Sequence, residues 1–224
     1  MRSAPLRRSS VKPMPPTAPA SAAGSDMARP KPDEAAIRDQ LLATAESLLS
    51  YHGASKVTVT EIAAVCGMSQ SNAYRYFPSK ASLMAALAER WFADVEAMAD
   101  EIIAHEATAK EKLREILLAT FQLKRTRLEA DPALFTAYME LAAANAWAVD
   151  AHTATRNDKI IRLVRVHLAE TGNRTARAAK VAQTLLDATV IIRDPNLILK
   201  YREDFSDERA ERLAAFALSL LDAP

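Results

Sequence analysis

Residues 58–80, TVTEIAAVCGMSQSNAYRYFPSK, hold the clearest structural pattern in the chain. Thr58 precedes an apolar run and Glu61 follows three residues later, the arrangement of a capping box that starts a short helix. Gly67 can end that helix, and Ser69 can cap the next one. Two short helices joined by a glycine turn are typical of a helix-turn-helix, whose second helix enters the major groove of DNA.

Helical periodicity continues on both sides of this stretch. Apolar residues recur at steps of three and four between residues 37 and 48, and again in each segment after residue 79. No segment alternates between apolar and polar residues over the length of a strand. The sequence therefore predicts an all-α fold, with later helices near 133–148, 152–171, 175–192 and 206–222 and a turn at Asp194-Pro195-Asn196.

Length and composition are those of a protein with its own buried core. Half of the 224 residues are hydrophobic and a quarter are charged, so the fold needs neither disulfides nor metal. Cys66 is the only cysteine, which excludes an intrachain disulfide and favours a cytoplasmic location. No apolar run approaches the roughly 20 residues that span a bilayer, so we expect no membrane partner.

Residues 1–32 differ in composition from the rest of the chain. They contain seven of the eleven prolines, and six basic side chains against one acid, a net charge of +5. Because the whole chain has a net charge of +1, the remainder carries −4. We expect a disordered arm. It is either a solvated tail, with Met27 as an alternative start, or a basic arm attracted to DNA phosphates.

The helix-turn-helix stretch also carries a family resemblance. The segments TVTEIA, GMS and YRYFPSK follow one another in the order and at the spacing of the tetracycline-repressor-like (TetR/AcrR) regulators, over about residues 35–82. The resemblance implies three small helices for DNA and a fourth that links them to a divergent helical domain for dimerisation and ligand binding. The implied domains are an arm at 1–32, a DNA-binding domain at 33–80 and a regulatory and dimerisation domain at 81–224.

Eight DNA-binding residues follow from the resemblance. Gln70, Ser71 and Tyr74 would reach base edges in the major groove, where a glutamine can bond adenine with two hydrogen bonds. The residues nearer the phosphates would be Asn72, Tyr76, Lys80, Thr58 and Thr60. Residues 33–80 hold four basic groups against five acids. Hydroxyl groups and helix N-termini, rather than net charge, would therefore bind the phosphates.

Ser71, Asn72 and Ala73 depart from the residues that are commoner in the family, which leaves the base preference open. Phe77 is expected to pack against the fourth helix.

Two apolar stripes near the C-terminus predict a homodimer interface. The family dimerises through its last two helices, and helix-turn-helix proteins usually bind DNA as twofold dimers. The stripes consist of Val181, Leu185, Ala188 and Ile192 on one helix and Leu213, Phe216 and Leu220 on the other. The alternative is that they face the chain's own core.

The middle helices offer the apolar walls of a small-molecule pocket. The candidates are Trp91, Phe121, Phe135, Tyr138, Met139 and Trp147. Each of them could instead be ordinary core.

Nothing in the sequence indicates catalysis, a metal or a cofactor. His105, His152 and His167 share no spacing typical of metal ligands, and four glycines leave no glycine-rich phosphate loop. The leading hypothesis is a repressor that a small-molecule inducer releases from its double-stranded operator DNA by a population shift. The alternatives are a regulator without such an inducer, an activator, and a helical enzyme or carrier in which the helix-turn-helix only packs.

Overall fold

The computed structural model describes residues 33–172 and 177–222, without the side chains of Trp147 and Ala148. The expected N-terminal arm lies outside these residues. Within the described part every regular element is a helix, so the predicted all-α fold is confirmed. The helices are α1 (Glu34–His52), α2 (Val59–Val65), α3 (Gln70–Tyr76), α4 (Lys80–Ala104), α5 (Ala109–Ala130), α6 (Pro132–Ala144), α7 (Ala146–Glu170), α8 (Ala178–Ala188), α9 (Val190–Arg193), α10 (Pro195–Lys200) and α11 (Asp207–Ser219).

Side-chain caps fix where α4 and α5 begin. Ser79 accepts a hydrogen bond from the Ser82 amide at 3.0 Å, and the Ser82 hydroxyl accepts one from the Ser79 amide at 3.0 Å, which closes a capping box at the start of α4. Thr108 and Glu111 form the same box at the start of α5. Each box satisfies backbone N–H groups that the first turn of a helix leaves without partners.

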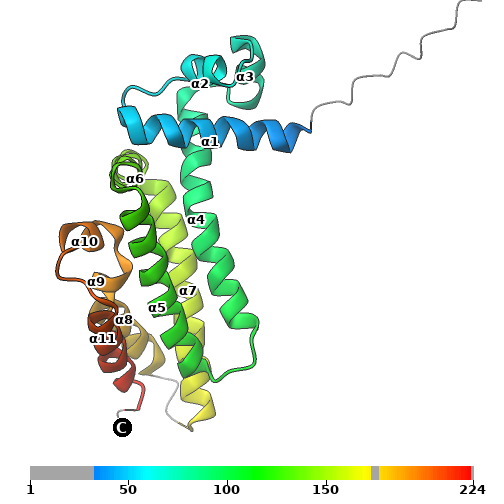
Figure 1. Ribbon diagram of the computed structural model, residues 1–224. Coiled ribbons are helices and arrows are strands. Elements are labelled where there is room, and N and C mark those ends of the chain that lie inside the picture. The colour runs from blue at the N-terminus through cyan, green and yellow to red at the C-terminus, as the bar shows by residue number, and fades with distance from the viewer. Residues whose placement is uncertain (1–32, 173–176, 223–224) are drawn as a thin grey trace, which may run out of the picture. The chain divides into compact units, whose positions relative to one another are not determined.

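The short helices α2 and α3 lie at one end of α4 (Figure 1). Both α2 and α3 lie beside its N-terminal end, and α1 crosses it there (Figure 1). Beyond this point α4 runs alongside α5 and α7, while α8 and α11 cover α7 and α5 respectively. Because α1 also packs against α6, the short helices are joined to the bundle through two helices rather than through α4 alone.

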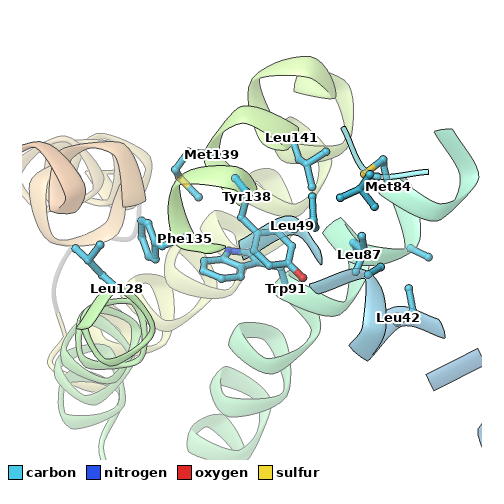
Figure 2. Close-up of a cluster of buried hydrophobic side chains, with 14 of the residues drawn as sticks. Leu42, Leu49, Met84, Leu87, Trp91, Leu128, Phe135, Tyr138, Met139 and Leu141 are labelled. Atoms are coloured by element: carbon cyan, nitrogen blue, oxygen red, sulfur yellow. The ribbon is translucent and has the colours of Figure 1, made fainter. Parts of the chain in front are cut away.

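A buried cluster of apolar side chains fills the junction between α1, α4 and α6 (Figure 2). The Trp91 ring lies against Tyr138 with ring centres 4.4 Å apart, and against Phe135 with ring centres 5.4 Å apart. Leu49 of α1 and Leu87 of α4 lie in the same cluster and are essentially inaccessible to solvent. The apolar periodicity of residues 37–48 therefore serves to dock α1 onto the bundle.

Some predicted helix boundaries were wrong after residue 140. The segments predicted at 133–148 and 152–171 are α6 and α7, and the break between them lies at Asn145. The single helix predicted at 175–192 is divided at Thr189 into α8 and α9. There the Thr189 hydroxyl donates to the carbonyl of Leu185 at 2.7 Å, in addition to the Thr189 amide at 3.1 Å, a contact that often bends helices. The predicted turn at Asp194-Pro195-Asn196 is instead the capped start of α10.

Gly67 provides a test of the turn between α2 and α3. Its φ is +66°, a left-handed conformation that costs residues with a Cβ roughly 1 kcal/mol or more. A Cβ at this position would meet no atom within 4 Å, so the cost comes from the backbone alone. We expect Gly67→Ala to lower the free energy of unfolding by about 1 kcal/mol in urea denaturation. Gly67→Asn should cost less, because asparagine tolerates this conformation; an equal loss for both would contradict the explanation.

Candidate nucleic-acid interface and ligand cavity

The helix-turn-helix forms as its local sequence requires. Thr58 caps α2 by accepting from the Glu61 amide at 3.2 Å, and Ser69 caps α3 by accepting from the Asn72 amide at 3.3 Å. The reciprocal half of the predicted capping box is absent from the described contacts: the Glu61 carboxylate lies 3.8 Å from Nε2 of His52 instead. Both helix starts are therefore fixed by hydroxyl groups.

One face of α3 is turned outward while the opposite face is buried. Gln70, Ser71 and Tyr74 are exposed, as the helical spacing requires for residues that share a face. Ala73 and Phe77 are buried below them, and the guanidinium of Arg38 covers the Phe77 ring at 4.6 Å. Phe77 is buried in the core cluster that also contains Leu83 and Met84 of α4, and α3 presents its polar side chains to solvent.

The five residues expected near phosphates lie in two kinds of environment. Thr58 and Thr60 are exposed at the start of α2. Asn72, Tyr76 and Lys80 are half-buried, and the Lys80 ammonium donates to the carbonyl of Ser55 at 2.8 Å. Lys80 thus ties the start of α4 to the loop before α2, in addition to any contact it makes with DNA.

Arg75 is a basic residue that the resemblance did not single out. Its side chain is exposed on α3, next to Tyr74, and lies 4.0 Å from the Glu34 carboxylate. An ion pair this long and exposed holds a side chain weakly. Arg75 can therefore turn toward a phosphate, and its position four residues after Ser71 is the sequence feature that places it on this side of the helix.

A cavity of about 440 Å³ is lined by residues of helices α4 to α10. This volume is in the range of small-molecule binding sites. Three of the predicted wall residues, Trp91, Tyr138 and Met139, line it. Phe121 and Phe135 do not, because both are fully buried in the core, and the side chain of Trp147 lies outside the described residues.

The polar residues that line the cavity were not predicted from the sequence. Three basic side chains line it, Lys124 of α5, Arg156 of α7 and Arg193 of α9. Burial, and then the neighbouring charge of Arg156, lower the pKa of Lys124 well below its usual range. The same two causes lower the pKa of Arg193 to about 10. These residues stand far apart in the sequence, and no local pattern marks them.

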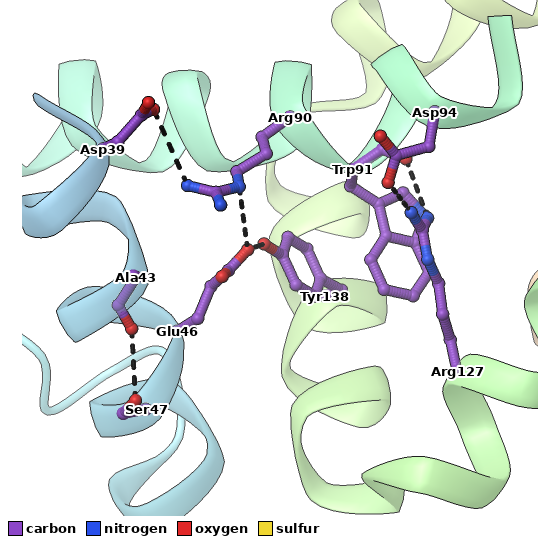
Figure 3. A network of polar contacts seen from close by, with 9 residues as sticks. All are labelled: Asp39, Ala43, Glu46, Ser47, Arg90, Trp91, Asp94, Arg127 and Tyr138. Carbon is purple, nitrogen blue, oxygen red and sulfur yellow. Dashed lines mark hydrogen bonds and ion pairs between the residues drawn. The ribbon is translucent and has the colours of Figure 1, made fainter. Parts of the chain in front are cut away.

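A polar network connects the cavity with α1 (Figure 3). The Tyr138 hydroxyl donates to Oε1 of Glu46 at 2.7 Å, and the Arg90 Nε atom lies 3.8 Å from the same oxygen. Burial, followed by this hydrogen bond to Glu46, raises the pKa of Tyr138 far above its ordinary value, so the phenol stays a donor. Tyr138 therefore touches both the cavity and a helix of the helix-turn-helix unit.

The two C-terminal stripes face in different directions. Leu185 and Ile192 are fully buried in the chain's own core, so for these residues the alternative interpretation holds. Phe216 of α11 is 69% exposed, and Val181, Ala188, Leu213 and Leu220 are half-buried. An exposed phenylalanine with apolar neighbours is a candidate contact for a second protein chain.

Residues 33–172 and 177–222 offer neither a cluster of metal ligands nor a helix of membrane-spanning length. They contain no group of three His, Cys, Asp or Glu side chains that could hold a metal ion. Nor is any helix at 33–172 or 177–222 long and apolar enough to cross a membrane.

The fold and the outward face of α3 define a helical DNA-binding regulator. Two family models match the chain: "Bacterial regulatory proteins, tetR family" over residues 41–87, and "Tetracyclin repressor-like, C-terminal domain" over residues 109–214. Together they cover more than half of it, and the chain belongs to the TetR family of DNA-binding transcriptional regulators. This is a family of regulators rather than of enzymes. No sequence among the curated proteins compared matches the chain.

Solved structures share the fold at low sequence identity. A protein from Pseudomonas aeruginosa PAO1, assigned as a transcriptional regulator, superposes with a TM-score of 0.68 at 16% identity, over 84% of this chain and 90% of that one. A TetR/AcrR regulator from Thermobifida fusca YX-ER1 has a TM-score of 0.61 at 18% identity, over 82% and 97%. A structure of SmeT in complex with triclosan has a TM-score of 0.63 at 21% identity, over 82% and 90%.

Proposed function

We propose that this regulator is a homodimeric repressor, which a small molecule bound in the cavity releases from its operator. The exposed polar face of α3 carries the DNA-binding part of the proposal. Gln70, Ser71 and Tyr74 point away from a buried base formed by Ala73 and Phe77, so they are free to meet base edges. Thr58, Thr60, Asn72, Tyr76 and Lys80 surround this face and are assigned to phosphates.

The proposed domains follow from these roles. Residues 33–80 bind DNA, and residues 81–224 bind the inducer and form the dimer. Residues 1–32 are assigned as an accessory arm. The boundary at residue 80 coincides with the start of α4, the helix that runs from the helix-turn-helix to the cavity.

The inducer part of the proposal is supported by the cavity and by the network beside it. Trp91 and Tyr138 line the cavity with their rings in contact, and Tyr138 also donates a hydrogen bond to Glu46 of α1. A ligand that moves this pair changes the contact between α6 and α1. A shift of α1 would then change the angle at which α3 is presented, which is a population shift between two arrangements. The SmeT complex with triclosan supports the idea that this fold can hold a small molecule.

DNA binding is tested by fluorescence polarisation with the DNA upstream of the protein's own gene and with scrambled DNA, at several salt concentrations. We expect binding to the genuine site at least ~10³ tighter than to scrambled DNA. Equal, weak binding to both, together with failure of a genome-wide selection to enrich any site, would contradict the proposal.

The dimer is tested at Phe216. We expect Phe216→Glu to weaken self-association at least about 100-fold, because it places an unpaired charge in an apolar interface. The measurement is molar mass by light scattering across a dilution series. The control is Val166→Glu, which makes the same change at an apolar residue of α7 that is 46% exposed. Equal dimerisation of both variants and the wild type would mean that α11 is not in the interface.

A further inference from the structure

Three basic side chains line the cavity without a carboxylate in contact. Lys124 is 3% exposed and Arg193 is 7% exposed. In the described part of the chain, neither they nor Arg156 has a carboxylate oxygen within ion-pair distance. Buried charges in proteins are ordinarily paired, because removing them from water is costly. The cavity therefore contains positive charge that the fold does not neutralise by contact.

The hydrogen bonds of these groups run to neutral acceptors. The Lys124 ammonium donates to the backbone carbonyl of Arg193. The Arg193 guanidinium donates to the Thr189 hydroxyl at 3.0 Å, to the Asn157 amide oxygen at 3.1 Å and to a backbone carbonyl at 2.6 Å. The Nε atom of Arg156 is buried and has no hydrogen-bond partner among the described residues. These contacts satisfy donors, but Arg156 keeps at least one donor unused.

The two acidic residues of the cavity act on the basic groups through charge alone, and their described hydrogen bonds run to other partners. Asp194 accepts from the Asn196 amide at 2.8 Å and so caps α10, and Asp187 accepts from the Gln183 side-chain amide at 2.8 Å. The lining holds three basic residues against two acids. A bound carboxylate would pair with the guanidinium groups and would favour the charged form of Lys124, whose pKa is lowered by burial. Much of the remaining wall is apolar, formed by Trp91, Phe92, Val95, Met139, Val149 and Leu186.

We propose that the cavity binds an amphipathic carboxylate, a molecule with one negative charge and an apolar aliphatic or aromatic body. Its carboxylate would be held by Arg156 with Lys124 and Arg193, since guanidinium groups bind carboxylates with two parallel hydrogen bonds. Its body would lie against Trp91 and Met139. The identification of this molecule as the inducer rests on the proposed function, whereas its binding does not.

Binding is tested by calorimetry on the full chain, without DNA. The probes are decanoate, phenylacetate and indoleacetate, each compared with its uncharged primary amide. We expect at least one carboxylate to bind about 10-fold or more tightly than its amide. A charge-assisted hydrogen bond contributes enough binding free energy to account for this difference in affinity. Arg156→Gln should remove that preference and leave the amide affinity unchanged. The control is Arg165→Gln, the same change at an exposed arginine of α7.

A second variant separates ligand binding from a purely structural role. If Lys124 is kept for the ligand, its burial without an acidic partner weakens the fold, and Lys124→Met should raise the Tm by about 2 to 4 °C while abolishing the preference for the carboxylate. A lower Tm with unchanged carboxylate affinity would instead make Lys124 a support for the end of α9 and would count against the proposal.

The possible outcomes distinguish failure of the carboxylate site from failure of the proposed inducer function. Equal affinities for every carboxylate and its amide, unchanged by Arg156→Gln, would overturn the carboxylate site. If instead a carboxylate binds as expected but leaves operator binding unaltered, the site stands and the inducer part of the proposed function fails. Release of the operator by the amides as strongly as by the acids would preserve the function and overturn the requirement for a negative charge.

Discussion

Substituting Gln70→Ala and Tyr74→Phe together is expected to weaken operator binding by at least about 100-fold. A well-placed contact to a base edge contributes roughly 1 to 3 kcal/mol. A homodimer makes each contact in both half-sites, so every substitution acts twice. Both side chains are exposed, and neither supports the core formed by Ala73 and Phe77. The variant should therefore unfold at the same urea concentration as the wild type.

The salt dependence of binding separates base contacts from phosphate contacts. Loss of base contacts should weaken binding to the operator but not to scrambled DNA, and should leave the slope of log K against log salt unchanged. The matched control changes Gln122→Ala on the exposed face of α5 and Tyr201→Phe after α10. If binding to the operator and to scrambled DNA is weakened equally, Gln70 and Tyr74 contact phosphates rather than base edges. Unaltered binding to the operator would remove them from the interface.

The helix-turn-helix could be predicted from the sequence because its boundaries are local. Thr58 and Ser69 cap the helices that they precede, and Gly67 takes the positive φ that the turn needs. Each of these features acts over three or four residues, so reading along the chain is enough to find it. The exposed face of α3 follows from the same helix spacing.

The cavity lining could not be predicted for the opposite reason. Lys124 and Arg193 are separated by 69 positions, yet the one donates to the other's carbonyl. In the sequence each stands in a helical segment where a basic residue usually faces solvent. Only the packing of α9 onto α5 buries them. Arg193, which lies beyond the division at Thr189, donates to the Thr189 hydroxyl and lines the cavity.

Apolar periodicity likewise predicts that a residue is buried, but it does not show whether the residue packs in the chain's own core or against a second chain. Leu185 and Phe216 were predicted in one interface from the same kind of stripe. Leu185 is fully buried within the chain, whereas Phe216 is 69% exposed. A stripe at helical spacing fits a core and an interface equally well, and only the fold distinguishes them.

Tyr138→Phe is expected to uncouple the cavity from DNA binding while leaving both binding sites intact. The substitution keeps the ring that packs against Trp91 at 4.4 Å and removes the hydroxyl that donates to Glu46 at 2.7 Å. Glu46 keeps Arg90 as a neighbour at 3.8 Å, so its carboxylate is not left alone (Figure 3). Operator affinity without ligand and ligand affinity without DNA should each change little. The factor by which saturating ligand weakens operator binding should fall toward one.

The size of the effect is set by the coupling free energy, which in allosteric proteins is typically about 1 to 3 kcal/mol, or roughly 5- to 150-fold in affinity. Because coupling between two binding sites is reciprocal, operator DNA must weaken ligand binding by the same factor that ligand weakens operator binding. In the wild type the effect of ligand on operator affinity should equal the effect of operator on ligand affinity. In Tyr138→Phe both factors should be reduced to the same extent. The control is Tyr201→Phe, a loss of hydroxyl at a half-buried tyrosine that lies outside the network. If Tyr138→Phe retains the full factor in both directions, the coupling does not pass through the contact between α6 and α1, and it must be carried by α4, which runs from the cavity to the helix-turn-helix.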